Sequence, residues 1–127
     1  MITLLKEMFS EMVVKKDISL IPHYYDKDLI IYTNGKQINY REFYDTHVEY
    51  YASSKKYSVV YDEQTLFASD DKVAGRMYIT ITRPNETPKE LEVILIVQYR
   101  NNKITRVWEL TFPDWSHLPA FQETLSK

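Results

Sequence analysis

The sequence predicts an α+β domain in which helices cover one face of a curved antiparallel sheet. The first half of the chain holds apolar residues at helical spacing, whereas residues 57–112 form β-rich segments separated by short turns. Helices followed by sequentially connected strands pack together on one side of the sheet. Long strands under such helices would enclose a cone with a mainly apolar cavity at its wide end, where a small ligand would bind.

Composition limits the possible functions. The chain has 127 residues, a net charge of −2, two glycines and no cysteine. This charge gives no basic surface for nucleic acid, and two glycines exclude a glycine-rich phosphate loop. Without cysteine there is no disulfide, thiolate nucleophile or cysteine zinc site, and a cytoplasmic location fits. No stretch of about 18 apolar residues is present to span a membrane.

We expect a single domain over residues 1–127, with its core at about residues 2–114 and a C-terminal tail at residues 115–127. The three histidines are scattered without the spacing of metal ligands. We therefore expect neither a metal nor a cofactor, and no nucleic-acid or membrane partner.

Three helices are expected before the main run of strands. Apolar spacing predicts an amphipathic helix over residues 2–16. Asp17 is placed to cap a second, shorter helix that runs to Tyr25. Asn39 and Glu42 match a capping box, which predicts the start of a third helix.

The strand signals are equally regular. Residues 29–33 are β-rich and end at the turn sequence Asn34-Gly35. Residues 91–99 are apolar at both alternating positions, which is typical of a strand covered on both faces. The four strands of the second half are expected at residues 57–67, 73–82, 91–99 and 104–112.

Glu109 is the main catalytic candidate. It lies between Trp108 and Leu110 on the last predicted strand, where a charge is unusual. Beside apolar walls its carboxyl would have a raised pKa and could act as a general base next to a carbonyl group. The alternative is a solvated carboxylate, or one paired with Arg76 or Arg106. Strand alternation alone does not say which face lines the cavity.

Three short motifs, in this order, point to a known family. They are residues 16–28 before the first strand, Arg41-Glu42-Phe43-Tyr44 in the third helix, and Lys103-Ile104 with Trp108-Glu109 in the last strand. Over about residues 2–114 the chain resembles the nuclear transport factor 2-like superfamily, a cystatin-like fold, and within it the SnoaL-like polyketide cyclases. This fold hosts enzymes, ligand binders and protein-docking modules.

The resemblance also implies site residues. In the cyclases the acid after Trp on the last strand is the general acid/base, and Glu109 occupies that place as Glu instead of the usual Asp. The middle-strand histidine of the cyclases has its approximate counterpart near Arg83, without a histidine. The base of the steroid-isomerase relatives would fall at Tyr32-Thr33-Asn34, without a carboxylate. The implied function is a cofactor-free cyclase, isomerase or lyase acting on a carbonyl compound, or alternatively a non-catalytic ligand-binding or docking module.

His47 is the second catalytic candidate. On the third helix it shares a face with Phe43 and Tyr51, where it would be either a proton shuttle or a core histidine satisfied by one hydrogen bond. Tyr25 or Tyr32 would donate a phenol to a ligand carbonyl, or simply pack at the mouth of the cone.

Arg76 and Tyr78 share one face of a middle strand, where Arg76 would hold a ligand carboxylate or enolate, or pair with Glu109 across the sheet. The predicted substrate-binding residues are thus Tyr25, Tyr32, Phe43, Tyr51, Arg76, Tyr78 and Trp108.

The sheet should also carry an exposed apolar face. Its candidates come from both strand parities, and a patch of that size predicts self-association. Members of the resembled family commonly dimerise through the sheet, so we expect a homodimer. The candidates are Val59, Tyr61, Leu66, Ile79, Leu95, Trp108 and Phe112.

Overall fold

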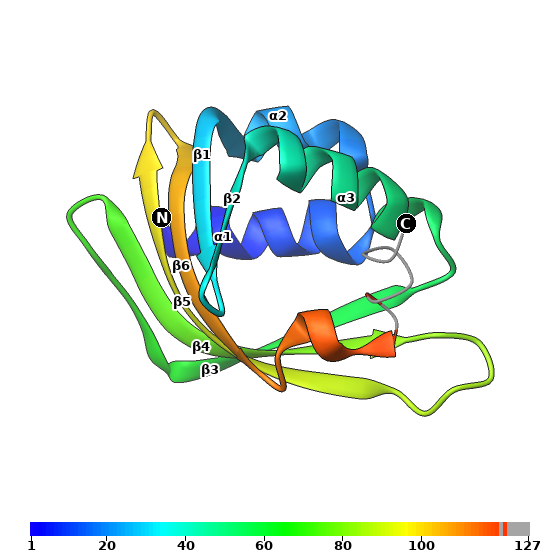
Figure 1. The fold of residues 1–127 in the computed structure, drawn as a ribbon. Coiled ribbons are helices and arrows are strands. Elements are labelled where there is room, and N and C mark those ends of the chain that lie inside the picture. The colour runs from blue at the N-terminus through cyan, green and yellow to red at the C-terminus, as the bar shows by residue number, and fades with distance from the viewer. Residues whose placement is uncertain (120, 122–127) are drawn as a thin grey trace.

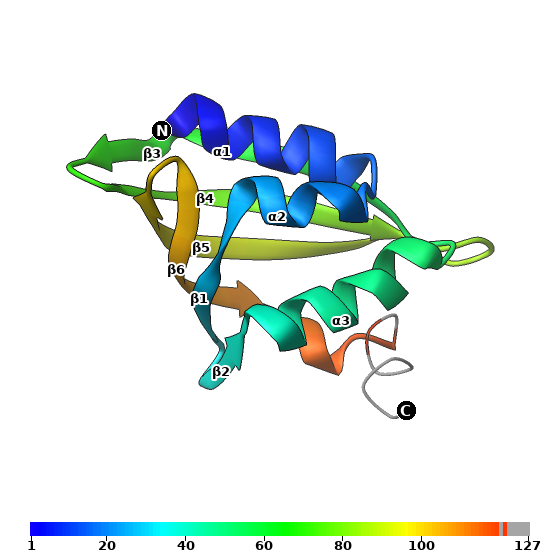
Figure 2. The ribbon, with the colours of Figure 1, turned by 90° about the horizontal axis from the view of Figure 1, so that it is seen from above.

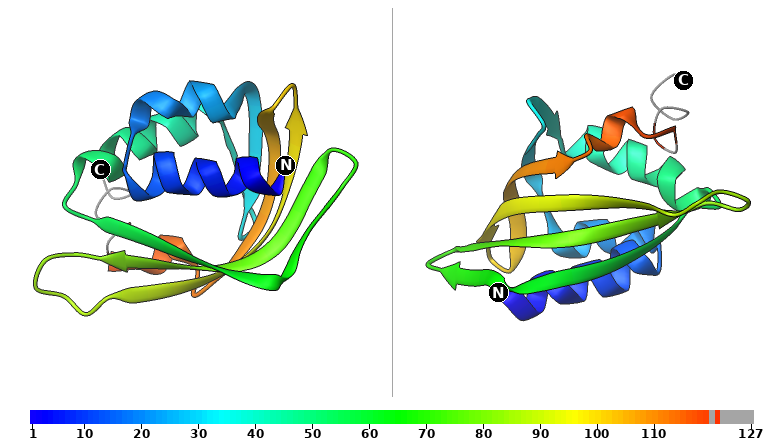
Figure 3. Two further views of the ribbon diagram at one scale, coloured as in Figure 1. Left: turned by 180° about the vertical axis from the view of Figure 1, so that it is seen from behind. Right: turned by 90° about the horizontal axis from the view of Figure 1, so that it is seen from below.

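The computed structural model describes residues 1–119 and 121. Helices lie against one face of a six-stranded, curved and unclosed sheet (Figure 1). Seen from above, the helices run over the strands (Figure 2). Seen from below, the opposite face of the sheet has no helix on it (Figure 3). The predicted α+β class is therefore confirmed, and the two faces of the sheet have very different surroundings.

The N-terminal helices follow the sequence pattern. Helix α1 (Ile2–Met8) continues into the π-helical segment η1 (Phe9–Val14), and the chain turns at Lys16, whose φ is 56°. The short helices η2 (Ile18–Leu20) and α2 (Ile21–Tyr24) come next, and the Asp17 side chain caps the first of them, as predicted. Within the described residues, no helix reaches the length and apolarity that a bilayer crossing requires.

Helix α3 (Tyr40–Ala52) begins at the predicted capping box. The Asn39 side chain accepts a hydrogen bond from the Glu42 amide at 2.9 Å, and the Glu42 carboxylate accepts one from the Asn39 amide at 3.2 Å. Both bonds satisfy amides that a helix start leaves free, so α3 begins at a defined residue. This start determines which residues of α3 face the sheet.

The sheet contains a short strand at Lys36–Asn39 and a parallel pairing that the sequence did not predict. All neighbouring strands are antiparallel except β1 and β6, which are parallel, so that the first strand lies beside the last. The strand order is β2-β1-β6-β5-β4-β3. Their bounds are β1 (Tyr25–Thr33), β2 (Lys36–Asn39), β3 (Lys56–Ser69), β4 (Lys72–Thr82), β5 (Lys89–Arg100) and β6 (Lys103–Phe112).

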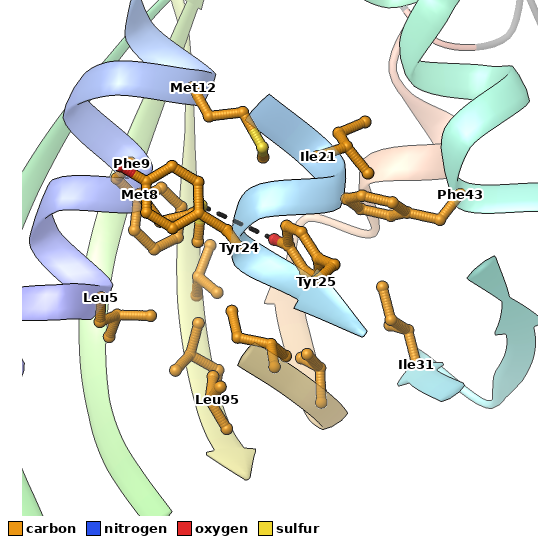
Figure 4. Packing of buried hydrophobic residues seen from close by; sticks show 14 of the residues in the cluster. Leu5, Met8, Phe9, Met12, Ile21, Tyr24, Tyr25, Ile31, Phe43 and Leu95 are labelled. Carbon is orange, nitrogen blue, oxygen red and sulfur yellow. Dashed lines mark hydrogen bonds between the residues drawn. The ribbon is translucent and has the colours of Figure 1, made fainter. Parts of the chain in front are cut away.

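The core lies between the helices and the concave face of the sheet. Leu5 and Met12 of the first helix are fully buried, as is Met77 of β4. Figure 4 shows the close packing near α2, where the Tyr25 hydroxyl points to the Met8 sulfur at 3.6 Å. Burial of this apolar surface is the main force that holds the helices on the sheet.

Strand β5 is covered on one face only, which corrects the expectation of two covered faces. Ile94 and Ile96 are 54% and 42% exposed, because no helix lies on the convex face. Of the predicted outer candidates, Leu95 is instead buried in the core, and Val59, Tyr61 and Ile79 pack against that core. We call the convex cluster the outer apolar patch, and define it as Tyr32, Ile94, Ile96, Trp108, Leu110 and Phe112.

Candidate functional site

A cavity of about 190 Å³ lies between the helices and the concave face of the sheet. Its wall is mostly aliphatic and aromatic, and none of the described residues that line it is Lys or Arg. A pocket of this kind, with a few convergent polar groups, is the usual form of a small-molecule site. The main polar groups in the wall are Tyr25, His47, Tyr50, Tyr51, Tyr57 and Glu109.

Glu109 points into this cavity from β6. Strand alternation places Trp108 on the convex face and Glu109 on the concave face, which settles the question that the sequence left open. Glu109 is part-buried, and part of its exposed surface faces the cavity. There, apolar side chains surround the carboxyl in place of bulk water. This desolvation raises the pKa of the Glu109 carboxyl, and a hydrogen bond with the Thr33 side chain acts in the opposite direction.

Thr33 and Trp115 position this carboxyl, and sequence analysis missed both. The parallel pairing places Thr33 directly beside Glu109, and Thr33 is only 1% exposed. The Trp115 indole Nε1 donates to the Thr33 Oγ1 at 2.8 Å. The same hydroxyl can donate its own proton, and its hydrogen bond to Glu109 lowers the pKa of that carboxyl, as a donor to the charged form does.

The segment after β6 is tied to the turn after β1. The Asn34 side-chain Nδ2 donates to Thr111 Oγ1 at 2.8 Å, and the Thr111 backbone amide donates to Asn34 Oδ1 at 2.9 Å. The Trp115 backbone amide donates to the same Thr111 hydroxyl at 3.1 Å. These bonds hold the 3₁₀ turn η3 (Trp115–His117) beneath α3, where Trp115 forms part of the cavity wall.

His47 is a neutral member of the wall. Its Nδ1 lies 2.8 Å from the Phe43 carbonyl oxygen, which can only accept, so Nδ1 carries the proton and Nε2 keeps a lone pair. Desolvation lowers the pKa of His47 to about 4, so the ring is uncharged at neutral pH. Its ring centre lies 4.0 Å from that of Phe43 and 5.4 Å from that of Tyr51.

Five of the predicted site residues come together in this cavity. Tyr25, Phe43, His47, Tyr51 and Glu109 all line it. The rings of Tyr25 and Phe43 lie 4.6 Å apart, and Figure 4 shows them side by side. Burial is the main reason that the pKa of Tyr25 is raised well above its ordinary value, so its phenol stays protonated. Their roles in binding and catalysis stay predictions.

Arg76 and Tyr78 do not reach the cavity, which corrects their predicted placement. They lie on the convex face, where the Arg76 guanidinium donates to the Asp62 carboxylate at 2.6 and 3.0 Å and to Glu92 at 3.2 Å. The Arg76 guanidinium also lies 5.6 Å from the centre of the Tyr78 ring. The expected pair between Arg76 and Glu109 is therefore wrong, since the sheet separates the two side chains.

Tyr32 and Trp108 also lie outside the cavity. Their rings stack on the convex face with centres 6.0 Å apart and planes within 9°. On each of the paired strands the next residue, Thr33 or Glu109, faces the cavity, so Tyr32 and Trp108 point to the opposite face of the sheet. The sequence expectation that they face a ligand in the cone is thus corrected by strand parity.

Comparisons with known proteins support the fold. No protein-family model and no curated protein matches the sequence. Solved structures do match: an LEH-like epoxide hydrolase from M. tuberculosis has a TM-score of 0.71 at 13% identity, over 94% of this chain and 90% of that one. The chain has the nuclear transport factor 2-like fold.

Other proteins with this fold differ in their assigned activity. IdmH from Streptomyces antibioticus, provisionally assigned as a polyketide cyclase, has a TM-score of 0.66 at 14% identity over 98% of this chain and 97% of its own. A protein from Catenulispora acidiphila with a ketosteroid isomerase-like fold, in complex with trimethylamine, has a TM-score of 0.68 at 13% identity over 92% and 94% of the two chains. At such low sequence identities, the similarity to these structures establishes the fold alone. The activity has to be argued from the residues of the site.

Proposed function

We propose that the protein is an enzyme that transfers a proton at a carbon next to a carbonyl group, as a SnoaL-like cyclase or isomerase would. The observation that supports this proposal is the Glu109 carboxyl, which lies inside an apolar cavity with a raised pKa. A general base is most effective when its pKa lies near the working pH. Among the described contacts, the Glu109 carboxyl has no partner of opposite charge. A chemical role therefore explains its position better than an ion pair does.

The proposed reaction needs only groups that the cavity contains. Ionised Glu109 would take the proton, and the Thr33 hydroxyl would hold the carboxylate in position. Tyr25, Phe43 and Tyr51 would form the walls that orient the substrate. His47, neutral and with an Nε2 lone pair, would accept a hydrogen bond from a substrate hydroxyl, and protonated Glu109 would return its proton to a carbon of the product. Proton transfer of this type requires no metal or redox cofactor.

We also propose that the protein works as a cytoplasmic homodimer, with a second copy covering the outer apolar patch. Leu110 and Phe112 are 66% and 77% exposed, although each is a large apolar side chain. Ile94 lies directly opposite Leu110, and Ile96 opposite Trp108, so the patch is continuous across β5 and β6. A contiguous exposed patch of this kind usually marks an interface.

The function can be tested with ketones that bind. Ligands would be found by thermal shift, because binding to the folded state raises the melting temperature. Each would then be incubated with the protein in heavy water, and deuterium next to the carbonyl measured by mass spectrometry. We expect exchange above the buffer rate for at least one bound ketone. Binding without exchange for every ketone would favour the non-catalytic alternative.

A further inference from the structure

Glu109 is the one group of the described cavity wall that can carry a charge near neutral pH. Burial raises the pKa of the tyrosines in that wall, so their phenols stay protonated. Desolvation lowers the pKa of the wall histidine to about 4, so its ring is neutral. When Glu109 ionises, the cavity therefore holds a single negative charge. The other titratable groups of the described wall, from β1, α3 and β3, are Tyr25, His47, Tyr50, Tyr51 and Tyr57.

The described part of the protein supplies no cation to balance that charge. None of its cavity-lining residues is Lys or Arg, and none of its ion pairs includes Glu109. Desolvation and the hydrogen bond with Thr33 shift the pKa of Glu109, and no neighbouring cation contributes. A buried charge is normally paired, because an unpaired one raises the free energy of the folded state. A ligand can provide the missing partner, since Glu109 lines the cavity and keeps part of its surface exposed.

Aromatic rings adjoin the Glu109 carboxyl. The charge of Glu109 is one cause of the raised pKa of Tyr25, so the two groups are close enough to interact. The Tyr25 ring lies 4.6 Å from the Phe43 ring, which lies 4.0 Å from that of His47. The Trp115 indole belongs to the same wall. Because the faces of aromatic rings attract cations, the wall and the carboxylate favour a ligand of the same charge.

The size of the cavity and one neighbouring cation limit the ligand further. A cavity of about 150 Å³ takes a benzene ring, so the 190 Å³ found here suits one ring with a short substituent. Lys55 is not part of the described wall, but its Nζ lies 5.5 Å from the centre of the Tyr50 ring and 5.9 Å from that of Phe121. A ligand ammonium group beside those two rings would meet a like charge, so we expect it at Glu109.

We propose that the cavity binds a small primary amine with a single ring, in its protonated form, and that the Glu109 carboxylate is the counter-ion. The ammonium group would donate hydrogen bonds to Glu109 and to Nε2 of His47, which keeps a lone pair. The aromatic wall would enclose the ring. This inference goes beyond the proposed function, because it adds a class of ligand and requires no proton transfer at carbon. A bound amine would also prevent Glu109 from acting as a base.

The test compares three probes of similar size: benzylamine, which is a cation at neutral pH, the neutral benzyl alcohol, and the anion benzoate. Their affinities would be measured by isothermal titration calorimetry. We expect benzylamine to bind about 10- to 100-fold more tightly than benzyl alcohol, the effect of hydrogen bonds to a charged group. Benzoate should not bind, because its charge would be desolvated beside a second carboxylate.

Glu109→Gln should remove the preference for benzylamine. Its affinity for benzyl alcohol should equal that of the wild type, which would show that the cavity is intact. Glu92→Gln makes the same chemical change on the convex face, where Glu92 pairs with Arg76, and should keep the full preference.

The pH dependence of binding provides a readout in the wild-type protein. Only ionised Glu109 pairs with the ammonium group, so the affinity for benzylamine should fall as the pH drops through the raised pKa of this carboxyl. Protonation of His47 at about pH 4 would weaken binding further, because it adds a positive charge to the wall. Bound benzylamine should in turn lower the pKa of Glu109, because the coupling between the two equilibria is reciprocal.

Three results would overturn this inference: benzylamine that binds no more tightly than benzyl alcohol, equal benzylamine affinity in wild type and Glu109→Gln, or an affinity that does not fall in acid. Deuterium exchange into a ketone without benzylamine binding would contradict this inference alone. Benzylamine binding without exchange into any bound ketone would contradict the proposed function alone. If both proposals hold, benzylamine should inhibit the exchange competitively.

Discussion

Glu109→Gln is expected to lower the rate of deuterium exchange into a bound ketone by about 100- to 10,000-fold, the usual contribution of a general base. Gln keeps the shape of the side chain and its hydrogen bonding to Thr33, but it cannot take a proton. The affinity for the ketone should change little, because the carbonyl is held elsewhere in the cavity. The measurement is single-turnover exchange in heavy water at saturating ketone.

The matched control is Glu92→Gln. Glu92 lies on β5 with its carboxylate on the convex face, 3.2 Å from Arg76, so the same chemical change is made outside the cavity. This variant should exchange at the wild-type rate. Equal exchange in wild type and Glu109→Gln would remove Glu109 from the mechanism, whereas loss in both variants would indicate a general structural effect.

The fold should survive the Glu109 substitution. A carboxyl whose pKa is raised in the folded state binds its proton more tightly there than in the unfolded chain. Its contribution to stability is present below the ordinary pKa and is lost as the pH rises through the raised one. Gln has no such loss, so at neutral pH the melting temperature of Glu109→Gln should equal or exceed that of the wild type.

Lysine at both Ile94 and Leu110 is expected to convert the dimer into a monomer. The two residues are directly opposite on β5 and β6, at the centre of the outer apolar patch. Losing both apolar contacts should weaken association by at least about 100-fold. Light scattering after gel filtration should give the monomer mass of 15.2 kDa for the variant and twice that for the wild type.

Val14→Lys with Val48→Lys is the control for added charge. These valines are 41% and 42% exposed and lie on the helices, away from the convex face of the sheet. This double variant should remain a dimer. A wild-type protein that is already monomeric would contradict the proposed interface, and so would a dimer that tolerates both lysines in the patch.

Local signals predicted the individual elements well, whereas the strand order needed long-range contacts. The Asp17 cap and the box of Asn39 with Glu42 are short-range hydrogen bonds, and residue type alone indicates them. The parallel pairing of β1 with β6 joins Thr33 to Glu109 across most of the chain. No local pattern encodes that neighbour, so Thr33 was not recognised as a site residue.

The site errors have one physical origin, which is strand parity. Tyr32, Arg76, Tyr78 and Trp108 are polar or aromatic residues on strands, and either face would accept them. The cavity lies on the concave face of the sheet because the helices cover only that face. Residues on α3 and at the start of β1 were placed correctly, since their direction follows from the helix face and the packing around Tyr25.

The raised pKa of the Glu109 carboxyl can be measured without any substrate. The protein would be labelled with carbon-13 at the glutamate carboxyls, and the Glu109 signal identified by its loss in Glu109→Gln. Thr33→Val should raise the midpoint further, because the Thr33 hydroxyl favours the charged form. Thr46→Val is the control: Thr46 also lines the cavity, but its hydroxyl donates to the Glu42 carbonyl at 2.9 Å.

This titration by NMR tests the central claim most directly. The carboxyl of a base in an apolar cavity titrates above the ordinary value, whereas a solvated glutamate titrates at that value and an ion-paired one below it. We predict a midpoint above 4.5 for wild-type Glu109. A Glu109 midpoint at or below 4.5 would mean that water or a cation reaches the carboxylate, and it would contradict the assignment of Glu109 as the base.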